Sequence, residues 1–175
     1  MQPSTLLDDE LATSKRSYEF RVWGERFDAC RRLTMLGGDE RQERLSDCYL
    51  LDGDPARNTK IRRRKVKVKH LVEEVQGFQW WSSAWHELAE ALEEVETDDP
   101  LRAVFVTKHR RRFRIGSMKA ESTTVGIQGR PRSLQTLAIE GPDIQDLIRL
   151  RAMLGLTGVP NLALHLAVGL ECGIR

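Results

Sequence analysis

Basic and apolar side chains alternate with a period of two along the segment from Arg102 to Gly116. Successive side chains of a β-strand point to opposite faces of a sheet, so this alternation predicts a strand with two unlike faces. One face carries the basic residues Lys108, Arg110, Arg112 and Arg114. The other face carries Phe105, His109 and Phe113. A fold for this chain must therefore place several like charges together on one surface of a sheet.

Other segments sort their side chains in the same way. Glu19 and Arg21 alternate with apolar residues, and so do Lys65, Lys67 and Lys69. The charged faces could simply be the solvated outside of a sheet, and this alternative stays open. Against it, aligned like charges on adjacent strands repel unless carboxylates or counter-anions share the face. A closed barrel of about eight strands accommodates the pattern, because its charged faces line a wet lumen while its apolar faces pack under helices.

The remaining patterns place strands and helices around these segments and indicate an α+β domain. Strands are expected at Tyr18–Trp23, at Leu45–Leu51, from about Asn58 to Val72 with a tight turn at Arg63-Arg64, at Met118–Ile127 and at Ser133–Glu140. Helices are expected at Phe27–Leu36, Ser83–Glu96, Asp143–Leu154 and Asn161–Leu170.

Some of these assignments depend on single residues. Ser83 is a suitable N-cap, and the helix that it would begin is expected to pack on the barrel through Trp80, Trp81 and Trp85. Asn161 is the expected N-cap of the last helix. The turn at Arg63-Arg64 has weaker support, because nothing in that dipeptide favours the positive φ angles of a two-residue hairpin turn.

Length and composition fit one domain. The chain has 175 residues, enough for a continuous core, and we expect a flexible lead-in at residues 1–16 and a single domain at residues 17–175. No run approaches the ~20 apolar residues of a membrane-spanning helix, and the N-terminus lacks signal-peptide features. We expect a cytoplasmic protein without membrane contact, and a homodimer is left open.

Metal sites built from cysteine and histidine are not expected. Cys30, Cys48 and Cys172 lack a C-x-x-C partner, and the four histidines are scattered without ligand spacing. Charge is more informative, because the net value of +2 conceals segregated signs. The segment from Lys60 to Lys69 is basic without any acid, whereas acidic residues concentrate between Glu87 and Asp99.

In serial order, several motifs resemble the CYTH superfamily, also called triphosphate tunnel metalloenzymes. They are Glu19 and Arg21 in the first strand, Asp47-Cys-Tyr49, Lys60-Ile-Arg62, Val68-Lys69, Val106-Thr-Lys-His-Arg110, Glu121 and Thr136-Leu-Ala-Ile-Glu140. Asn58–Arg62, Val68–Val72 and Gly77–Trp80 resemble a bacterial branch of that superfamily. The resemblance implies an α+β fold in which an antiparallel eight-stranded β-barrel forms a tunnel, with helices packed on the outside.

The chain departs from the superfamily at its signature. The usual E-x-E-x-K motif appears here as Ser17-x-Glu19-x-Arg21, and the closing E-x-E motif as Ala138-x-Glu140. In the superfamily, carboxylates hold Mg²⁺ or Mn²⁺ and basic residues grip phosphate oxygens. Carried over, this implies metal ligands at Glu19, Glu121 and Glu140. It implies phosphate-binding residues at Arg21, Lys60, Arg62, Lys67, Lys69, Lys108, Arg110 and Arg112.

The leading functional hypothesis is a metal-assisted phosphohydrolase, a triphosphatase acting on tripolyphosphate or an organic triphosphate. No side chain is assigned as a general base. The alternative is a non-catalytic module of the same fold that binds polyphosphate or nucleotides, supported by the missing carboxylates. Nucleic-acid binding through Arg62–Lys65 and Arg110–Arg112 ranks third, because charges that alternate with valine on strands indicate a lined interior.

Overall fold

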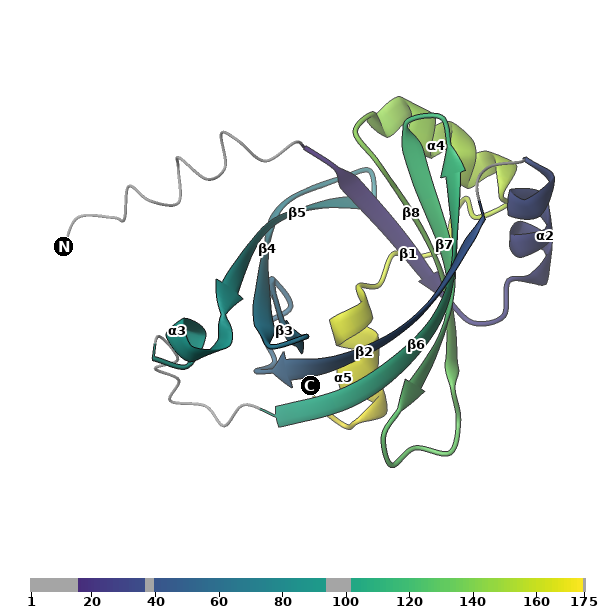
Figure 1. Ribbon diagram of the computed structural model, residues 1–175. Coiled ribbons are helices and arrows are strands. Elements are labelled where there is room, and N and C mark those ends of the chain that lie inside the picture. The colour runs from purple at the N-terminus through teal and green to yellow at the C-terminus, as the bar shows by residue number, and fades with distance from the viewer. Residues whose placement is uncertain (1–15, 37–39, 94–101, 175) are drawn as a thin grey trace, which may run out of the picture.

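The strands close into a barrel in the order β1-β5-β4-β3-β2-β6-β7-β8, and β8 returns to β1 (Figure 1). This computed structural model describes residues 16–36, 40–93 and 102–174. Within them the strands are β1 Tyr18–Trp23, β2 Arg41–Leu51, β3 Arg57–Arg62, β4 Lys65–Val75, β5 Phe78–Glu87, β6 Arg102–Ile115, β7 Met118–Ile127 and β8 Leu134–Gly141. The helices are α2 Phe27–Met35, α3 Leu88–Glu93, α4 Ile144–Met153 and α5 Leu164–Glu171. All strand pairs are antiparallel, which confirms the predicted fold class.

The outward apolar faces of the barrel pack under helices α2 and α4. Phe20, Leu137 and Ile139 from β1 and β8 are fully buried there, together with Leu33 of α2 and Leu147 of α4. Asp143 begins α4 as predicted, because its carboxylate accepts hydrogen bonds from the backbone N–H groups of the first turn. The apolar half of the alternation seen in the sequence therefore forms the core outside the barrel wall.

A second apolar cluster lies inside the barrel, at one end. Val106 on β6 shares the inward face of Lys108, and it packs with Tyr49 of β2 and Val125 of β7. Leu164 and Val168 of α5 complete this cluster, so α5 lies beside β2 and covers that end of the barrel (Figure 1). The interior is consequently divided into an apolar section under α5 and a charged section beyond it.

The hairpin turn between β3 and β4 is where the sequence predicted it. Arg63 and Arg64 form the two-residue turn with φ angles of 49° and 65°. Both residues therefore adopt the left-handed conformation that such a turn requires, although neither is a residue type that favours it. Pairing of all of β3 with Lys65–His70 of β4 outweighs this local cost.

The predicted helix at Ser83–Glu96 is largely wrong. Strand β5 continues through Ser83 and Trp85 to Glu87, and only Leu88–Glu93 is helical as α3; residues 94–96 lie outside the described part of the chain. The reason is long-range, because Ser83 pairs with Lys69 and Trp85 with Lys67 on β4. Backbone pairing with a neighbouring strand overrides a helical apolar pattern that was visible only locally.

Asn161 is not the N-cap of the last helix. The helix α5 begins at Leu164 with Ala163 as its N-cap residue. Asn161 instead links β1 to the turn between β4 and β5, because its side chain accepts a hydrogen bond from the Arg21 backbone N–H at 2.9 Å and donates one to the Gly77 carbonyl at 2.9 Å. An amide side chain serves either purpose, and local sequence does not distinguish them.

The first predicted helix is present as α2, but its apolar residues are not all buried. Leu33 is buried, whereas Phe27 is 75% exposed. The predicted lead-in at residues 1–16 lies outside the described residues except for Arg16, whose guanidinium pairs with Glu73 and lies over the Trp80 ring. In the described part of the chain, no helix is both long and apolar enough to cross a membrane.

Candidate functional site

The charged section of the barrel interior contains a cavity of about 200 Å³ lined mainly by cations. Among the described residues, nine Lys and Arg side chains line it, against three glutamates. The basic residues are Arg21, Lys60, Arg62, Lys67, Lys69, Lys108, Arg110, Arg112 and Lys119, and the acidic ones are Glu19, Glu121 and Glu140. All residues predicted as phosphate-binding or metal-binding thus line one cavity, while their roles stay predictions. Lys119 was missed, although it shares the strand face of Glu121 two residues on.

Exposure increases along β6 from one end of the cavity to the other. The Lys108 side chain is 5% exposed, Arg110 17% and Arg112 38%. Lys108 follows the apolar section under α5 after Val106, so the exposure is lowest at the end that α5 covers. The cavity therefore opens to solvent on the side of Arg112.

A buried carboxylate, Asp47 on β2, holds three of the cations together. Arg62 donates from Nε to Oδ1 at 2.5 Å and from Nη2 to Oδ2 at 2.8 Å. Lys108 and Lys60 donate to Oδ2 at 2.7 and 3.4 Å. Burial opposes ionisation, but the hydrogen bond from Arg62 and the charges of both lysines bring the pKa of the Asp47 carboxyl well below its ordinary value. The sequence shows Asp47 on the inward face two residues before Tyr49, but no role was predicted for it.

Burial also changes the pKa values of the two lysines at this end of the cavity, Lys60 and Lys108. It lowers the pKa of Lys60 and of Lys108 from 10.5 to about 8, against the opposing attraction of Asp47. Lys108 donates a further hydrogen bond to the Tyr49 hydroxyl at 2.6 Å. Both lysines consequently change charge close to neutral pH.

Anion binding in this cavity is expected to weaken as pH rises through about 8, because Lys60 and Lys108 then lose their positive charges. Sulfate is the suitable probe, since its own charge is constant over this interval. Calorimetry should show a several-fold loss of sulfate affinity between about pH 7 and about pH 9. The variants Lys60→Arg and Lys108→Arg keep their charge and should flatten the profile. An identical profile in the wild type and both variants would contradict this assignment.

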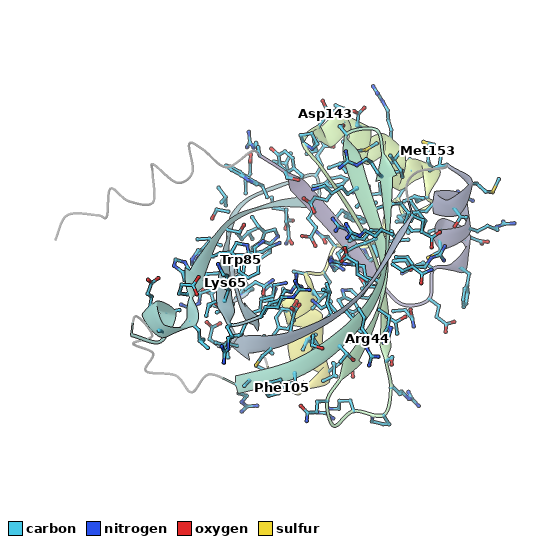
Figure 2. The ribbon with its side chains drawn as sticks, viewed as in Figure 1. Arg44, Lys65, Trp85, Phe105, Asp143 and Met153 are labelled. Atoms are coloured by element: carbon cyan, nitrogen blue, oxygen red, sulfur yellow. The ribbon has the colours of Figure 1, made fainter. Side chains whose placement is uncertain are left out.

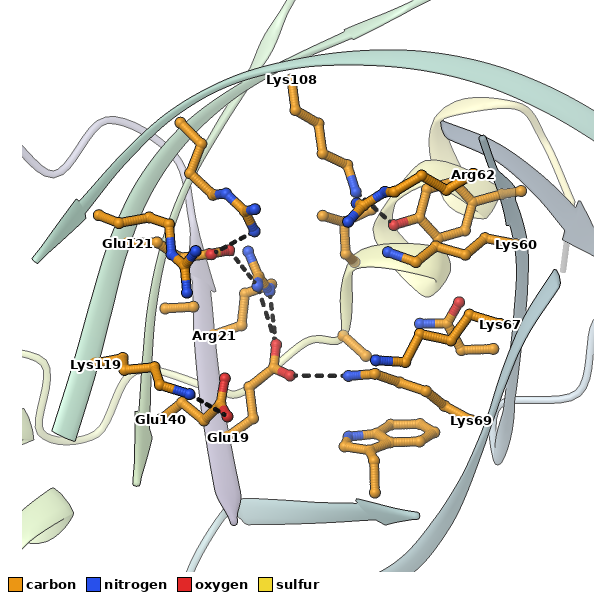
Figure 3. A pocket seen from close by; sticks show the side chains of 18 of the residues that line it. Glu19, Arg21, Lys60, Arg62, Lys67, Lys69, Lys108, Lys119, Glu121 and Glu140 are labelled. Atoms are coloured by element: carbon orange, nitrogen blue, oxygen red, sulfur yellow. Dashed lines mark hydrogen bonds and ion pairs between the residues drawn. The ribbon is translucent and has the colours of Figure 1, made fainter. Parts of the chain in front are cut away.

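Arg21 on β1 lies between two glutamates (Figure 3). It donates from Nε to Glu19 Oε1 at 3.0 Å and from Nη2 to Glu121 Oε1 at 2.8 Å. The second oxygen of Glu19 lies 3.5 Å from Lys69 Nζ, and the second oxygen of Glu121 accepts from Arg110 at 3.0 Å. Although burial opposes it, these cations lower the pKa of Glu19 to about 2 and lower that of Glu121.

Glu43 on β2 extends this network towards the open end. It accepts hydrogen bonds from Arg110 at 2.6 Å and from Arg112 at 3.1 Å, and these bonds lower its pKa. It was not predicted as part of the site. The register alone would have placed it there, because Glu43 is the cross-strand partner of Arg110.

Comparison with solved structures identifies the architecture. The PH1012 protein of Pyrococcus horikoshii superimposes with a TM-score of 0.61 and 14% sequence identity, over 81% of this chain and 92% of that one. The chain has the CYTH, or triphosphate tunnel, fold. Other solved structures that match are Hippeastrum HpAC1, described as a "putative adenylyl cyclase" with a dominant triphosphatase activity (TM-score 0.57, 11% identity, 91% and 97% coverage), and the Mimivirus capping enzyme triphosphatase (0.54, 12%, 86% and 94%). No model of a protein family matches the sequence, and no curated protein matches it.

Trp80, Trp81 and Trp85 all lie in strand β5, before the short helix α3. Trp81 lines the cavity, and its ring meets His165 of α5 edge-on at 5.6 Å. Trp85 is 47% exposed near Lys65 on the neighbouring strand (Figure 2), and its ring lies 5.2 Å from Lys67 Nζ. The prediction that they pack the helix expected at Ser83–Glu96 on the barrel is therefore wrong.

The glutamates of this tunnel do not form a ready site for a divalent metal. Both carboxylate oxygens of Glu19 and of Glu121 already face cations. Glu140 accepts from Ser17 Oγ at 3.1 Å and lies 3.8 Å from Lys119. Across the described residues, no group of three or more His, Cys, Asp or Glu side chains has an arrangement that could hold a metal ion. The donor set in this arrangement therefore does not fit Mg²⁺ or Mn²⁺, and metal ligation by these glutamates stays a prediction.

Proposed function

We propose that the tunnel binds a triphosphate-type anion, either tripolyphosphate or the triphosphate group of an organic molecule. The observation that carries this proposal is the concentration of basic side chains from β1, β3, β4, β6 and β7 in one partly buried cavity. The solved tunnels with triphosphatase in their descriptions support the same class of ligand.

The arrangement of the cavity suits an extended anion. Lys60, Lys67 and Lys69 come from one wall, and Arg21 with its glutamates comes from the opposite wall (Figure 3). An anion between them can accept charge-assisted hydrogen bonds from both sides, and these are among the strongest polar contacts in proteins. It would also relieve the repulsion among aligned cations that the carboxylates offset only in part.

Affinity is expected to rise with the charge of the anion, in the order orthophosphate, pyrophosphate, tripolyphosphate, since each added phosphate can reach further cations of the tunnel. Added salt should weaken all three, and tripolyphosphate most, because screening acts on each charge pair. Isothermal titration calorimetry at low and high salt measures both effects. Equal affinity for orthophosphate and tripolyphosphate, or no detectable binding of either, would reject the proposal.

Hydrolysis of the bound triphosphate is the second candidate function. It is favoured by the guanidinium and ammonium groups around the cavity, because such groups stabilise charge that develops on phosphoryl oxygens. The test is phosphate release from tripolyphosphate, ATP and thiamine triphosphate, each with Mg²⁺ and with Mn²⁺. Turnover of any of them supports a hydrolase. Binding without turnover across this panel supports the non-catalytic module.

The basic runs that suggested nucleic-acid binding are divided between two surfaces. Arg62 faces the cavity, whereas Arg63 and Arg64 lie exposed in the turn. In the second run, Arg110 faces the cavity and Arg111 pairs with Glu40 outside it at 2.7 Å. This division favours a small anion inside the tunnel as the ligand.

A further inference from the structure

We infer that this tunnel holds its anion without a divalent metal, because the Arg21 guanidinium already bridges two of the three carboxylates predicted to bind one. The inference rests on the proposed anion binding and adds how the anion is held. It concerns Arg21, Glu19 and Glu121, which lie together on one wall of the cavity (Figure 3).

Arg21 is fixed in this bridging position. Arg21 has two further contacts besides those with the glutamates. Its Nη1 lies 3.4 Å from Thr136 Oγ1, and its backbone N–H donates to the Asn161 side chain. The residue is only 6% exposed. A metal ion that took over Glu19 and Glu121 would leave this guanidinium buried without its carboxylates. Leaving a buried charge unpaired is strongly unfavourable.

On the neighbouring strand β8, Ala138 offers no ligand for a metal ion. Ala138 on β8 is the cross-strand partner of both Arg21 on β1 and Glu121 on β7, so the three residues form one row across the inner wall. Ala138 lines the cavity, and its methyl group carries no oxygen. The row formed by Arg21, Ala138 and Glu121 therefore contains only one carboxylate, that of Glu121. Mg²⁺ can bind through one or two carboxylates plus phosphate oxygens, but here those carboxylates are engaged by cations.

The charge that a metal would contribute is already present in the tunnel. A guanidinium has five N–H donors, so Arg21 keeps donors for a phosphate oxygen while it bridges the glutamates. The lysines of the opposite wall provide further positive charge. The protein's own cations can therefore neutralise a triphosphate.

The test compares tripolyphosphate binding to metal-stripped protein in excess EDTA with binding in excess Mg²⁺ or Mn²⁺, measured by calorimetry. We expect full binding in EDTA and equal or weaker apparent binding with the metals, because the free anion also complexes them. Titration of Mn²⁺ alone into the protein should give no binding heat at millimolar concentration. Tripolyphosphate affinity that improves about tenfold or more with either metal would overturn the inference and leave the proposed function intact. Absence of binding under every condition would instead reject the proposed function.

The variant Arg21→Lys tests whether the arginine is the cause. A lysine keeps the charge but lacks the planar fork that serves both glutamates at once, so we expect Mn²⁺ to bind this variant and to strengthen its tripolyphosphate binding. Arg112→Lys is the matched control, because Arg112 lines the same cavity but pairs with Glu43 instead, and it should remain insensitive to metal. Equal metal responses in both variants would show that Arg21 is not the determinant. If Arg21→Lys does not fold, the wild-type comparison alone decides.

Discussion

Replacing Asp47 by asparagine is expected to destabilise the free protein by about 3 kcal/mol, because it leaves buried cations without their shared carboxylate. For a chain of this size the midpoint of thermal unfolding should fall by roughly 6–12 °C. The side chains concerned are those of Lys60, Arg62 and Lys108, which all bond to Asp47. Tripolyphosphate should raise the unfolding temperature of Asp47→Asn more than that of the wild type, because the bound anion replaces the lost negative charge.

The control and the pH dependence make this prediction specific. Glu140→Gln removes a carboxylate that is 44% exposed, and it should change stability by about 0.5 kcal/mol at most. The penalty for Asp47→Asn should be smaller at about pH 9 than at about pH 7, since Lys60 and Lys108 can then lose their protons in the folded state. An unchanged unfolding temperature for Asp47→Asn would contradict the role of Asp47 as the centre of this cluster.

Replacing Arg110 by alanine should raise the dissociation constant for tripolyphosphate by about tenfold or more, because a charge-assisted hydrogen bond is worth about 1.5–3 kcal/mol. The change also frees Glu43 and Glu121 from a cation that now holds them at 2.6 and 3.0 Å. Their negative charges would then repel the anion more strongly. Calorimetry under low-salt conditions measures the loss.

Arg44→Ala is the matched control for this affinity change. Arg44 is the exposed neighbour of Glu43 on β2, and it does not line the cavity. Its removal should leave the dissociation constant within about twofold of the wild type, apart from a small long-range charge effect. Similar losses in Arg110→Ala and Arg44→Ala would mean that tripolyphosphate binds on the outer surface rather than in the tunnel.

The residues that line the barrel interior could be predicted, because the alternation of side chains between the two faces of a strand can be read from the local sequence. On β6, the alternation places Lys108, Arg110 and Arg112 on one face whatever the neighbouring strands are. All three line the cavity, as do the cations predicted on β3 and β4. Alternation alone does not show that the sheet closes or that its charged face points inward. The resemblance of the motif order to the CYTH superfamily supported both expectations.

The features that were missed depend on contacts between distant parts of the chain. Ser83 and Trp85 have a plausible helical pattern, and only their pairing with β4 shows that they belong to a strand. Glu43 and Asp47 become part of the site because β2 pairs with β6 and β3 in one particular register. A single sequence does not contain that register, since it is set by the packing of the whole barrel.

Helix α5 covers one end of the barrel interior and leaves the charged section at the other end. In the described part of the chain, Leu164 and Val168 pack in the apolar end, so an anion would enter and leave at the exposed end, past Arg112. A chain of phosphates bound as proposed would therefore enter by its end, and any part longer than the cavity would stay in solvent. Such a pocket would distinguish a terminal phosphate group from the middle of a polymer through its shape alone.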